Sequence, residues 1–239
     1  MTYPNAPITE AVIDIRVVPR EGLDVEEFRK LGSEFASGFK IQNDQFRLSG
    51  SITPGGPNQP PVTAKVGIQF VGDAKLFQTQ IDGWTFNKLA PYRGWEEEFR
   101  DQARTLWRAY REVAQPQAIT RVALRYVNRL DLPMPMRDFQ VYLRTYPELG
   151  PDLPQGLSHF LMQLQIPHED IGAMLFLNMA LVPSARPNVA SVVLDLDLFR
   201  AADLPQTETD LWDCIEVLRI RKNKVFEACI TEATRELFR

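Results

Sequence analysis

The sequence predicts an α+β fold in which two pseudo-symmetric β-α-β-β-β-α halves form a continuous antiparallel sheet with long helices on one face. Residues 8–15, ITEAVIDI, match residues 119–126, ITRVALRY, without a gap. Both stretches alternate apolar and polar side chains, which is typical of a strand with one buried face. The same order of expected elements follows each stretch. We therefore predict a single domain, 1–239, built of two structural repeats, 1–115 and 116–239.

The first half is expected to begin with a strand and to end with a long helix. Asp24 followed by Glu27 forms a capping-box pattern at the start of a helix. Gly72-Asp73 is a hairpin signal between two apolar runs. The Pro- and Gly-rich segment Pro54–Pro61 is expected to be a surface loop, with a recognition loop as the alternative. The expected elements are a strand over 8–17, a helix over 25–37, strands near 39–48, 66–70 and 76–82, and a helix over 94–113.

The second half is expected to repeat this order. Thr207 to Asp210 carries the start signal of its long helix. Cys214 and Cys229 lie in that helix and are predicted to be buried and reduced. The expected elements are a strand over 119–132, a short helix near 136–145, strands near 157–166, 172–182 and 189–198, and a helix over 208–237.

The two repeated strands are predicted to be antiparallel neighbours at the centre of the sheet. In the register that we expect, Glu10 lies opposite Arg125 and Asp14 lies opposite Arg121. Opposite charges would then face each other across the two strands, and each such pair contributes about 0.2–1 kcal/mol.

The candidate binding face consists of polar residues on these strands and on the strand over 189–198. Guanidinium groups in a row suit carboxylate or phosphate oxygens, and internal ion pairing is the other interpretation. The two aspartates of LDLD share a strand face and would seat a divalent cation if a third oxygen ligand joined them. Asn128 interrupts an apolar row, so we expect a buried, hydrogen-bonded amide. The candidate residues are Glu10, Asp14, Arg121, Arg125, Asn128, Arg129, Asp195 and Asp197.

Composition and motif searches exclude several classes of function. A net charge of −4 and a pI near 5.4 disfavour a general nucleic-acid binder. The dense basic run Arg219–Lys224 is expected to be a solvated helix surface, with phosphate contact as the alternative. The two histidines lack metal-site spacing, and no nucleotide-binding or nucleophile-elbow motif occurs. We therefore predict no catalytic residue, no metal site and no cofactor.

No apolar run is long enough to cross a membrane and the N-terminus has no signal-peptide pattern, so a cytoplasmic location is expected.

Three short motifs resemble the landmarks of a known family. They are Pro7-Ile8-x-Glu10-Ala11, Leu124-Arg125-Tyr126-x-Asn128-Arg129 and Leu194-Asp195-Leu196-Asp197. This pattern is similar to that of a sporadically distributed family of uncharacterised prokaryotic proteins of about this length. The family's usual Gly or Lys before Leu-Arg-Tyr is Ala123 here. The resemblance implies that the three landmarks belong together in one fold, and the family's patchy distribution is similar to that of mobile or defence-associated genes.

These observations favour a non-enzymatic binding or interaction protein that meets a protein partner, and a homodimer is compatible with them. The alternative is a small-ligand-binding or metal-dependent catalytic protein with an Arg/Asp-lined pocket between sheet and helices. A pocket of about 300 Å³ or more, with Arg125 and Asp195 converging on it, would favour the alternative. A filled core with an exposed apolar patch would favour the first interpretation.

Overall fold

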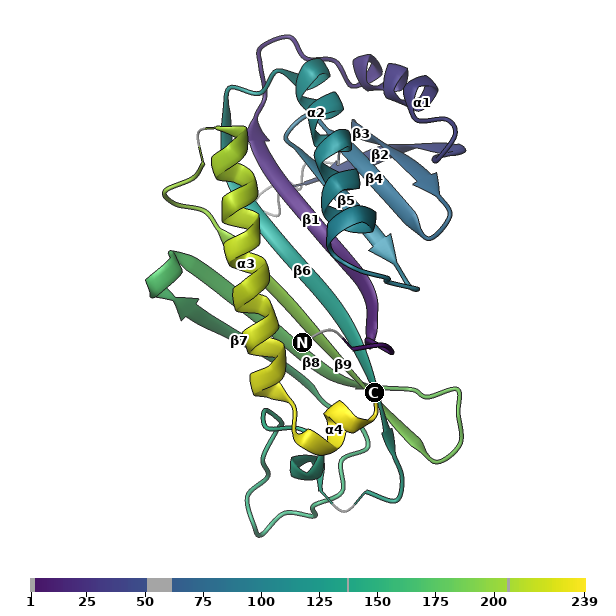
Figure 1. Cartoon of the computed structure of the whole chain (residues 1–239), viewed down its shortest axis with the longest axis vertical. Coiled ribbons are helices and arrows are strands. Elements are labelled where there is room, and N and C mark those ends of the chain that lie inside the picture. Colours follow the sequence, from purple (N-terminus) through teal and green to yellow (C-terminus); the bar gives the residue numbers. More distant parts are fainter. Residues whose placement is uncertain (1–2, 51–61, 137, 206) are drawn as a thin grey trace, which may run out of the picture. The chain divides into compact units, whose positions relative to one another are not determined.

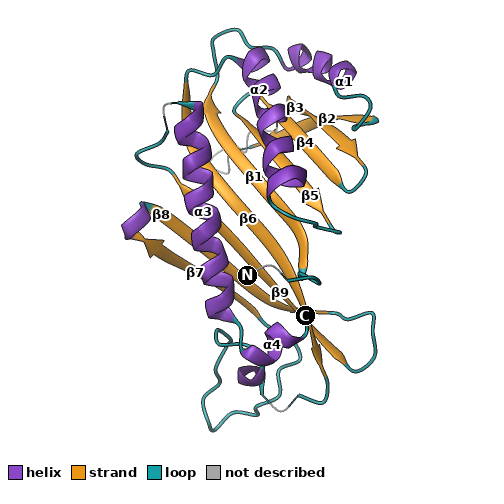
Figure 2. Ribbon diagram, in the orientation of Figure 1, coloured by secondary structure: helices purple, strands orange, loops and turns teal. Residues whose placement is uncertain are grey.

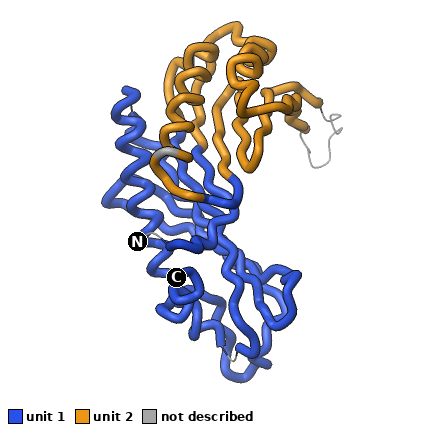
Figure 3. The backbone as a smooth tube through the Cα atoms, turned by 45° about the vertical axis from the view of Figure 1, so that its right-hand side comes forward, with its two compact units in different colours: residues 1–13, 89–92, 121–239 blue, residues 14–88, 93–120 orange. Residues whose placement is uncertain are grey.

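A computed structural model describes residues 3–50, 62–136, 138–205 and 207–239. Over these residues the chain is an α+β protein with one nine-stranded antiparallel sheet and few helices (Figure 2). The predicted loop Pro54–Pro61 lies outside the described residues. The chain forms two compact units (Figure 3). Unit 1 contains Met1–Ile13, Leu89–Tyr92 and Arg121–Arg239, and unit 2 contains Asp14–Lys88 and Arg93–Thr120.

The elements follow the chain as labelled in Figure 1. The strands are β1 (Ile8–Val18), β2 (Ile41–Ser49), β3 (Val62–Gly72), β4 (Lys75–Gln80), β5 (Gly83–Leu89), β6 (Ala118–Pro133), β7 (Leu161–His168), β8 (Ala173–Val182) and β9 (Val189–Arg200). The helices are η1 (Val25–Arg29), α1 (Lys30–Glu34), η2 (Glu96–Asp101), α2 (Gln102–Ala114), η3 (Phe139–Val141), η4 (Glu169–Ile171), α3 (Glu208–Cys229) and α4 (Glu232–Glu236). None of the described helices combines the length and the apolar character that a membrane span requires.

The two repeated strands are neighbours, as predicted. Strands β1 and β6 run through both units, and the hydrogen-bonded strand order is β2-β3-β4-β5-β1-β6-β9-β8-β7. The backbone N–H of Gln117 donates to the carbonyl of Val18 at 2.9 Å, which fits the predicted register. The N–H of Arg129 donates to the carbonyl of Pro7 at 2.8 Å, one residue out of that register. The register prediction is therefore right at one end of the strand pair and shifted by one residue at the other.

Aromatic side chains form the core of unit 2, in which α2 lies over the sheet (Figure 1). The apolar residues of α2 recur at helical spacing, and they are buried on one side of the helix. Trp107 packs against Trp84 of β5 with ring centroids 5.7 Å apart. Tyr110 stacks on Phe28 of η1 at 5.5 Å and donates its hydroxyl to the carbonyl of Gln80 at 3.0 Å. These contacts hold α2 and η1 against the strands.

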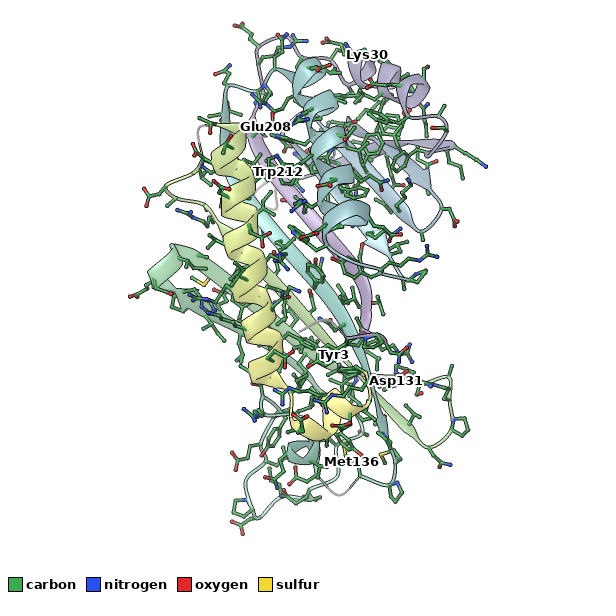
Figure 4. All side chains as sticks on the ribbon, viewed as in Figure 1. Tyr3, Lys30, Asp131, Met136, Glu208 and Trp212 are labelled. Carbon is green, nitrogen blue, oxygen red and sulfur yellow. The ribbon has the colours of Figure 1, made fainter. Side chains whose placement is uncertain are left out.

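In unit 1, the long helix α3 lies along one face of the strands (Figure 1). Alternate residues of β6 and β9 are buried beneath it, as the alternation predicted. Near the C-terminus, Tyr3 packs edge-on against Phe238 at 5.6 Å and donates its hydroxyl to Glu227 at 2.8 Å (Figure 4). Burial, and then the bond to Glu227, raises the pKa of Tyr3 to about 12. This pair ties the first described residue to the last helices of the chain.

The first half contains one strand more than predicted. Ile81 and Asp82 form a tight turn that pairs Gln80 with Gly83, and the chain returns as β5. Gly83 is required here because a Cβ atom would lie 2.9 Å from the carbonyl oxygen of Ile15. Residues 84–87 alternate apolar and polar side chains as a strand does, and in the structure Trp84 to Phe86 are all buried. The half therefore has the order β-α-β-β-β-β-α.

Three predicted helices are shorter or broken in the structure. The helix expected over 25–37 is the 3₁₀ helix η1 followed by α1, which ends at Glu34; the Asp24 capping box is present. The helix expected near 136–145 is only the turn η3. The helix expected over 208–237 is interrupted at Ile230, whose backbone is extended. There the N–H of Arg144 donates to the carbonyl of Cys229 at 2.8 Å, so a neighbouring segment satisfies the helix end.

Candidate functional site

Most of the predicted polar residues of unit 1 share one face of its sheet. Successive side chains of a strand point to opposite sides, so Arg125 of β6 lies on the side opposite Tyr126. Tyr126 lies under α3, because Lys222 of that helix contacts its ring. The face that carries Arg125 is therefore the one turned away from α3. We call it the arginine face; it comprises Arg121, Arg125, Arg129, Asp131, Arg186, Asp195 and Asp197.

Diagonal ion pairs cross this face between β6 and β9. The strand register places Arg125 directly opposite Asp197 and Val127 opposite Asp195. Arg125 nevertheless binds Asp195, through Nε to Oδ1 at 2.7 Å and Nη2 to Oδ2 at 2.8 Å. In the same way, Nη2 of Arg121 donates to Asp197 at 2.8 Å. Internal ion pairing was one of the two interpretations of these residues, and in the structure Arg121 and Arg125 form such pairs.

A third cluster on the face surrounds Asp131 of β6 (Figure 4). Arg129 donates through Nε to Asp131 at 3.0 Å and through Nη2 to the hydroxyl of Ser191 at 3.0 Å. Ser191 in turn donates to Asp131 at 2.6 Å, and Arg186 also binds this carboxylate. Burial acts to raise the pKa of Asp131, but the hydrogen bonds from Ser191, Arg129 and Arg186 outweigh it, so the pKa is lowered. The carboxylate is therefore held ionised and oriented.

On the arginine face, the guanidinium groups are more exposed to solvent than the carboxylates that they bind. The side chain of Arg125 is 46% exposed, whereas that of its partner Asp195 is 9% exposed. Likewise Arg186 is 65% exposed and Asp131 is 24% exposed. The hydrogen bond to Asp195, and then the charges of nearby carboxylates, raise the pKa of Arg125. Guanidinium groups thus form the outer layer and carboxylates the inner one, so an approaching molecule meets positive charge first.

The other predicted site residues lie elsewhere or act indirectly. Glu10 of β1 is close enough for its charge to contribute to the raised pKa of Arg125. Asp14 belongs to unit 2, where it accepts from Nη2 of Arg16 at 2.6 Å and from the hydroxyl of Thr85 at 2.9 Å. Asn128 is 3% exposed and donates to the carbonyl of Leu194 at 3.1 Å. Asn128 is thus buried and hydrogen-bonded as expected, and its bond joins β6 to β9.

A shallow apolar pocket adjoins the arginine face. The guanidinium carbon of Arg121 lies 4.4 Å from the ring centroid of Phe199, and Phe199 packs edge-on against Phe176 at 5.1 Å. With Met174 and neighbouring residues, these two rings line a pocket of about 510 Å³. Sequence reasoning missed this pocket, because Phe176 and Phe199 come together only through the pairing of β8 with β9.

Sequence reasoning also missed a buried lysine beneath α3. Lys222 is 6% exposed, and its Nζ lies 3.4 Å from the ring centroid of Tyr126. Burial, and then the charge of Arg219, lowers the pKa of Lys222 to about 7. The hydroxyl of Tyr126 shares a 2.8 Å hydrogen bond with that of Tyr92. An amine with this pKa has the basicity of a nucleophile or a general base, but none of the three described pockets is lined by Lys222.

The basic run Arg219–Lys224 is therefore not the uniformly solvated surface that was expected. Arg219 binds Glu216, with Nε to Oε1 at 2.8 Å. Arg221 binds Asp170 and also contacts Nδ1 of His168 at 2.8 Å. Burial and the charge of Arg221 lower the pKa of His168. The run is divided among one buried amine, two ion-paired guanidinium groups and an exposed end at Lys224.

The described residues offer little support for metal or thiol chemistry. Within them, no group of three or more His, Cys, Asp and Glu side chains is placed to hold a metal ion. Cys214 and Cys229 are buried free thiols, and burial raises the pKa of both. A raised pKa leaves little reactive thiolate near neutral pH. The three described pockets are lined by neither Arg125 nor Asp195.

Comparison with known proteins adds no relative to this picture. The chain matches no protein-family model, and no curated protein matches it.

Proposed function

We propose that the protein is a non-enzymatic binding protein and that the arginine face recognises an acidic segment of a protein partner. The observation that carries the proposal is the depth arrangement of charge, with Arg125 and Arg186 outside and Asp195 and Asp131 inside. Each inner carboxylate fixes the guanidinium group above it. A guanidinium that is already oriented loses less rotamer entropy when a partner binds, and it still has N–H donors for a carboxylate.

The apolar pocket beside Arg121 supports a protein partner rather than a nucleic acid. Arginine and aromatic side chains around a shallow pocket are typical of the residues that dominate protein interfaces. An apolar side chain of the partner would lie in the pocket against the packed rings of Phe176 and Phe199, and acidic neighbours would meet Arg121 and Arg125. The net charge of −4 and the carboxylates under the arginines work against a polyanion as long as DNA.

Quantitative affinity capture from the native cytosol tests this proposal. The baits are the wild-type protein, a variant with Arg186→Glu and Arg125→Lys, and a control with Arg47→Gln. Arg186→Glu reverses an exposed charge. Arg125→Lys keeps a cation beside Asp195 but removes the planar guanidinium group and its paired N–H donors. Arg47 is an exposed arginine of β2 in unit 2 that pairs with Asp82. We expect a protein that is retained by the wild type and the control and lost with the double variant, and whose purified acidic segment binds in a salt-dependent manner.

Other results would contradict the proposal. They are the same set of captured proteins for all three baits, preferential retention of a labelled oligonucleotide, or capture of nothing but further copies of the bait. The last result would replace the partner by a homodimer. Thermal unfolding of each bait establishes that any loss of retention comes from the altered face.

The repeat, the family and the location are further proposals. We infer that β5 of the first half corresponds to β9 of the second, since each lies beside the leading strand of its half, and that β2 is an addition. With this correspondence the pseudo-symmetric halves and the long helices on one face remain our interpretation of the fold.

The three landmark motifs support a shared fold with the sporadically distributed family. A defence- or mobile-element-associated role is tested by identifying the genes that neighbour the gene of this protein. Two buried free cysteines suit the reducing cytoplasm.

A further inference from the structure

A second pocket, in unit 2, contains more positive charge than its surroundings balance. It has a volume of about 550 Å³ and is lined by the loop before β2, the β3–β4 hairpin, the end of β5 and the first turns of η2 and α2. Three lysines and two carboxylates line it: Lys40, Lys75, Lys88, Asp73 and Glu98. The pocket therefore carries one net positive charge within a chain whose net charge is −4.

Of the three lysines that line the pocket, Lys75 is half-buried and forms no ion pair among the described residues, although the charges of Asp73 and Glu98 partly offset its own. Its Nζ lies 4.8 Å from the ring centroid of Phe39. Among the described residues no carboxylate lies within salt-bridge distance of it. Burial, and then the charge of Lys88, lowers the pKa of Lys75. Lys75 of β4 and Lys88 of β5 are directly paired across the two strands, so their ammonium groups repel each other, and an anion held by both would relieve the repulsion.

Next to Lys88, the pocket is lined by Glu98 and Gln102, each of which carries an acceptor without a donor among the described residues. Among the described residues, Oε2 of Glu98 and Oε1 of Gln102 have almost no accessible surface and no hydrogen-bond donor. The Nζ of Lys88 is 3.8 Å from Oε2 of Glu98, which is within ion-pair range but too far for a hydrogen bond. A buried acceptor without a donor costs about 1–3 kcal/mol, so a hydroxyl group placed there by a ligand would be favourable.

The floor of the pocket depends on a close backbone contact. A Cβ atom on Gly72 would lie 2.2 Å from the carbonyl oxygen of Gly38, so only glycine allows the hairpin to approach the loop before β2. This approach brings Lys75, which follows Gly72 in the hairpin, to the same wall as Phe39. The arrangement is therefore set by the backbone and does not depend on flexible side chains alone.

We propose that this pocket binds a small hydroxylated anion, with its phosphate or carboxylate between Lys75 and Lys88 and its hydroxyl groups on Glu98 and Gln102. The ligand class comprises sugar phosphates and sugar acids. A pocket of this volume admits a ligand of that size and excludes a folded partner. The site lies in unit 2 and shares no residue with the arginine face of unit 1, so it stands independently of the proposed protein partner.

Calorimetric titration of the full chain with four probes at millimolar concentration tests the site. The probes are glucose 6-phosphate, gluconate, inorganic phosphate and glucose. We expect at least one of the two hydroxylated anions to bind more tightly than phosphate, and glucose not to bind. Affinity should fall as the pH rises toward 10.5, the ordinary pKa of lysine, because Lys75 loses its proton earlier than that.

Three variants assign the binding to the pocket. Lys75→Met should weaken anion binding by about tenfold or more. Gln102→Leu should weaken the hydroxylated anions without weakening inorganic phosphate. Lys30→Met, an exposed lysine of α1 outside the pocket (Figure 4), should change nothing. The proposal is overturned if none of the anions binds, if phosphate binds as well as both hydroxylated anions, or if Lys75→Met binds them as the wild type does.

Discussion

At the residue scale, the two most informative charged groups differ in how their charge is compensated. Asp195 is buried beside a guanidinium group that neutralises it. Lys222 is buried against an aromatic ring and has no carboxylate partner among the described residues. A buried ion without a partner is destabilising, and the usual response is a shift of pKa toward the neutral form. The two sites therefore respond to substitution and to pH in different ways.

Replacing Lys222 by methionine should stabilise the protein near neutral pH by about 1–3 kcal/mol, because the new side chain keeps the volume and removes the buried amine. The folded pKa of Lys222 is about 7, and the ordinary value is 10.5. Between these values the unfolded chain binds a proton that the folded chain does not, so the stability contributed by Lys222 rises with pH. Urea unfolding of both proteins from pH 6 to 10 should show the advantage of the variant shrinking as the pH rises. If the free energies of unfolding of the wild type and the variant depended on pH in the same way, the lowered pKa of Lys222 would be ruled out. The control is Lys224→Met, which replaces an exposed lysine of the same helix.

Replacing Arg125 by methionine should destabilise the protein by about 1–3 kcal/mol, since it leaves the buried carboxylate of Asp195 without its bidentate partner. Adding Asp195→Asn should recover part of that loss, because no unpaired charge then remains. The free energy of unfolding of the two single variants and the double variant gives the coupling. Arg186→Met, at a more exposed position, should stay within about 0.5 kcal/mol of wild type. Zero coupling would mean that the pair does not stabilise the fold.

At the element scale, local signals fixed where helices begin better than where they end. The caps Asp24 and Thr207 both start helices in the structure. The end of α3 depends on contacts with a distant segment, because the N–H of Arg144 donates to the carbonyl of Cys229 and the N–H of Thr231 donates to the carbonyl of Tyr142. A capping side chain bonds a backbone N–H only two or three residues further on, so it can be recognised in the local sequence. The end of α3 is bonded by Arg144, and the local sequence around Cys229 does not indicate that contact.

The cap of α3 gives a direct test at this scale. The hydroxyl of Thr207 accepts from the N–H of Asp210 at 3.1 Å. Thr207→Ala should lower the free energy of unfolding by about 0.5–2 kcal/mol, because one N–H at the helix start loses its acceptor. Thr209→Ala, an exposed position in the first turn, should have little effect. Thermal unfolding followed by circular dichroism measures both, and equal effects would remove the special role of Thr207.

At the scale of the whole molecule, unit 1 is assembled from both ends of the chain. Its strand β6 is hydrogen-bonded to the first residues of the protein, through Arg129 to Pro7 and through the hydroxyl of Thr9 to the carbonyl of Val127. Tyr3 adds the contacts to Glu227 and Phe238. The two predicted repeats, 1–115 and 116–239, are therefore not separate folding units, because each lacks residues that unit 1 needs.

The fragment 116–239 should fail to unfold cooperatively when it is expressed alone, since one edge of β6 loses its partner strand. Trp212 is the sole tryptophan of this fragment and reports on α3 (Figure 4). Urea titration followed by its fluorescence should give a broad, shallow change, and mixing with fragment 1–115 should restore a sharp transition. A sharp transition for the isolated fragment would contradict the single-domain interpretation.

The sequence by itself determined which residues form the two leading strands, which of their side chains are buried, and that the candidate polar residues of β6 and β9 share a face. Period-two alternation is a local property and survives in any antiparallel sheet. Asn128 was placed in the core on the same grounds, whereas the two cysteines were placed there because they lie in a helix with an apolar pattern.

Only the tertiary structure decided which partners these residues meet. The pairing of Arg125 with Asp195 rather than with the directly opposite Asp197 depends on the register of β6 and β9 and on diagonal reach. The burial of Lys222 depends on the packing of α3 against Tyr126, and the lysine pocket of unit 2 depends on the approach of Gly72 to Gly38. These are contacts between residues far apart in the chain, and neither propensity nor periodicity encodes them.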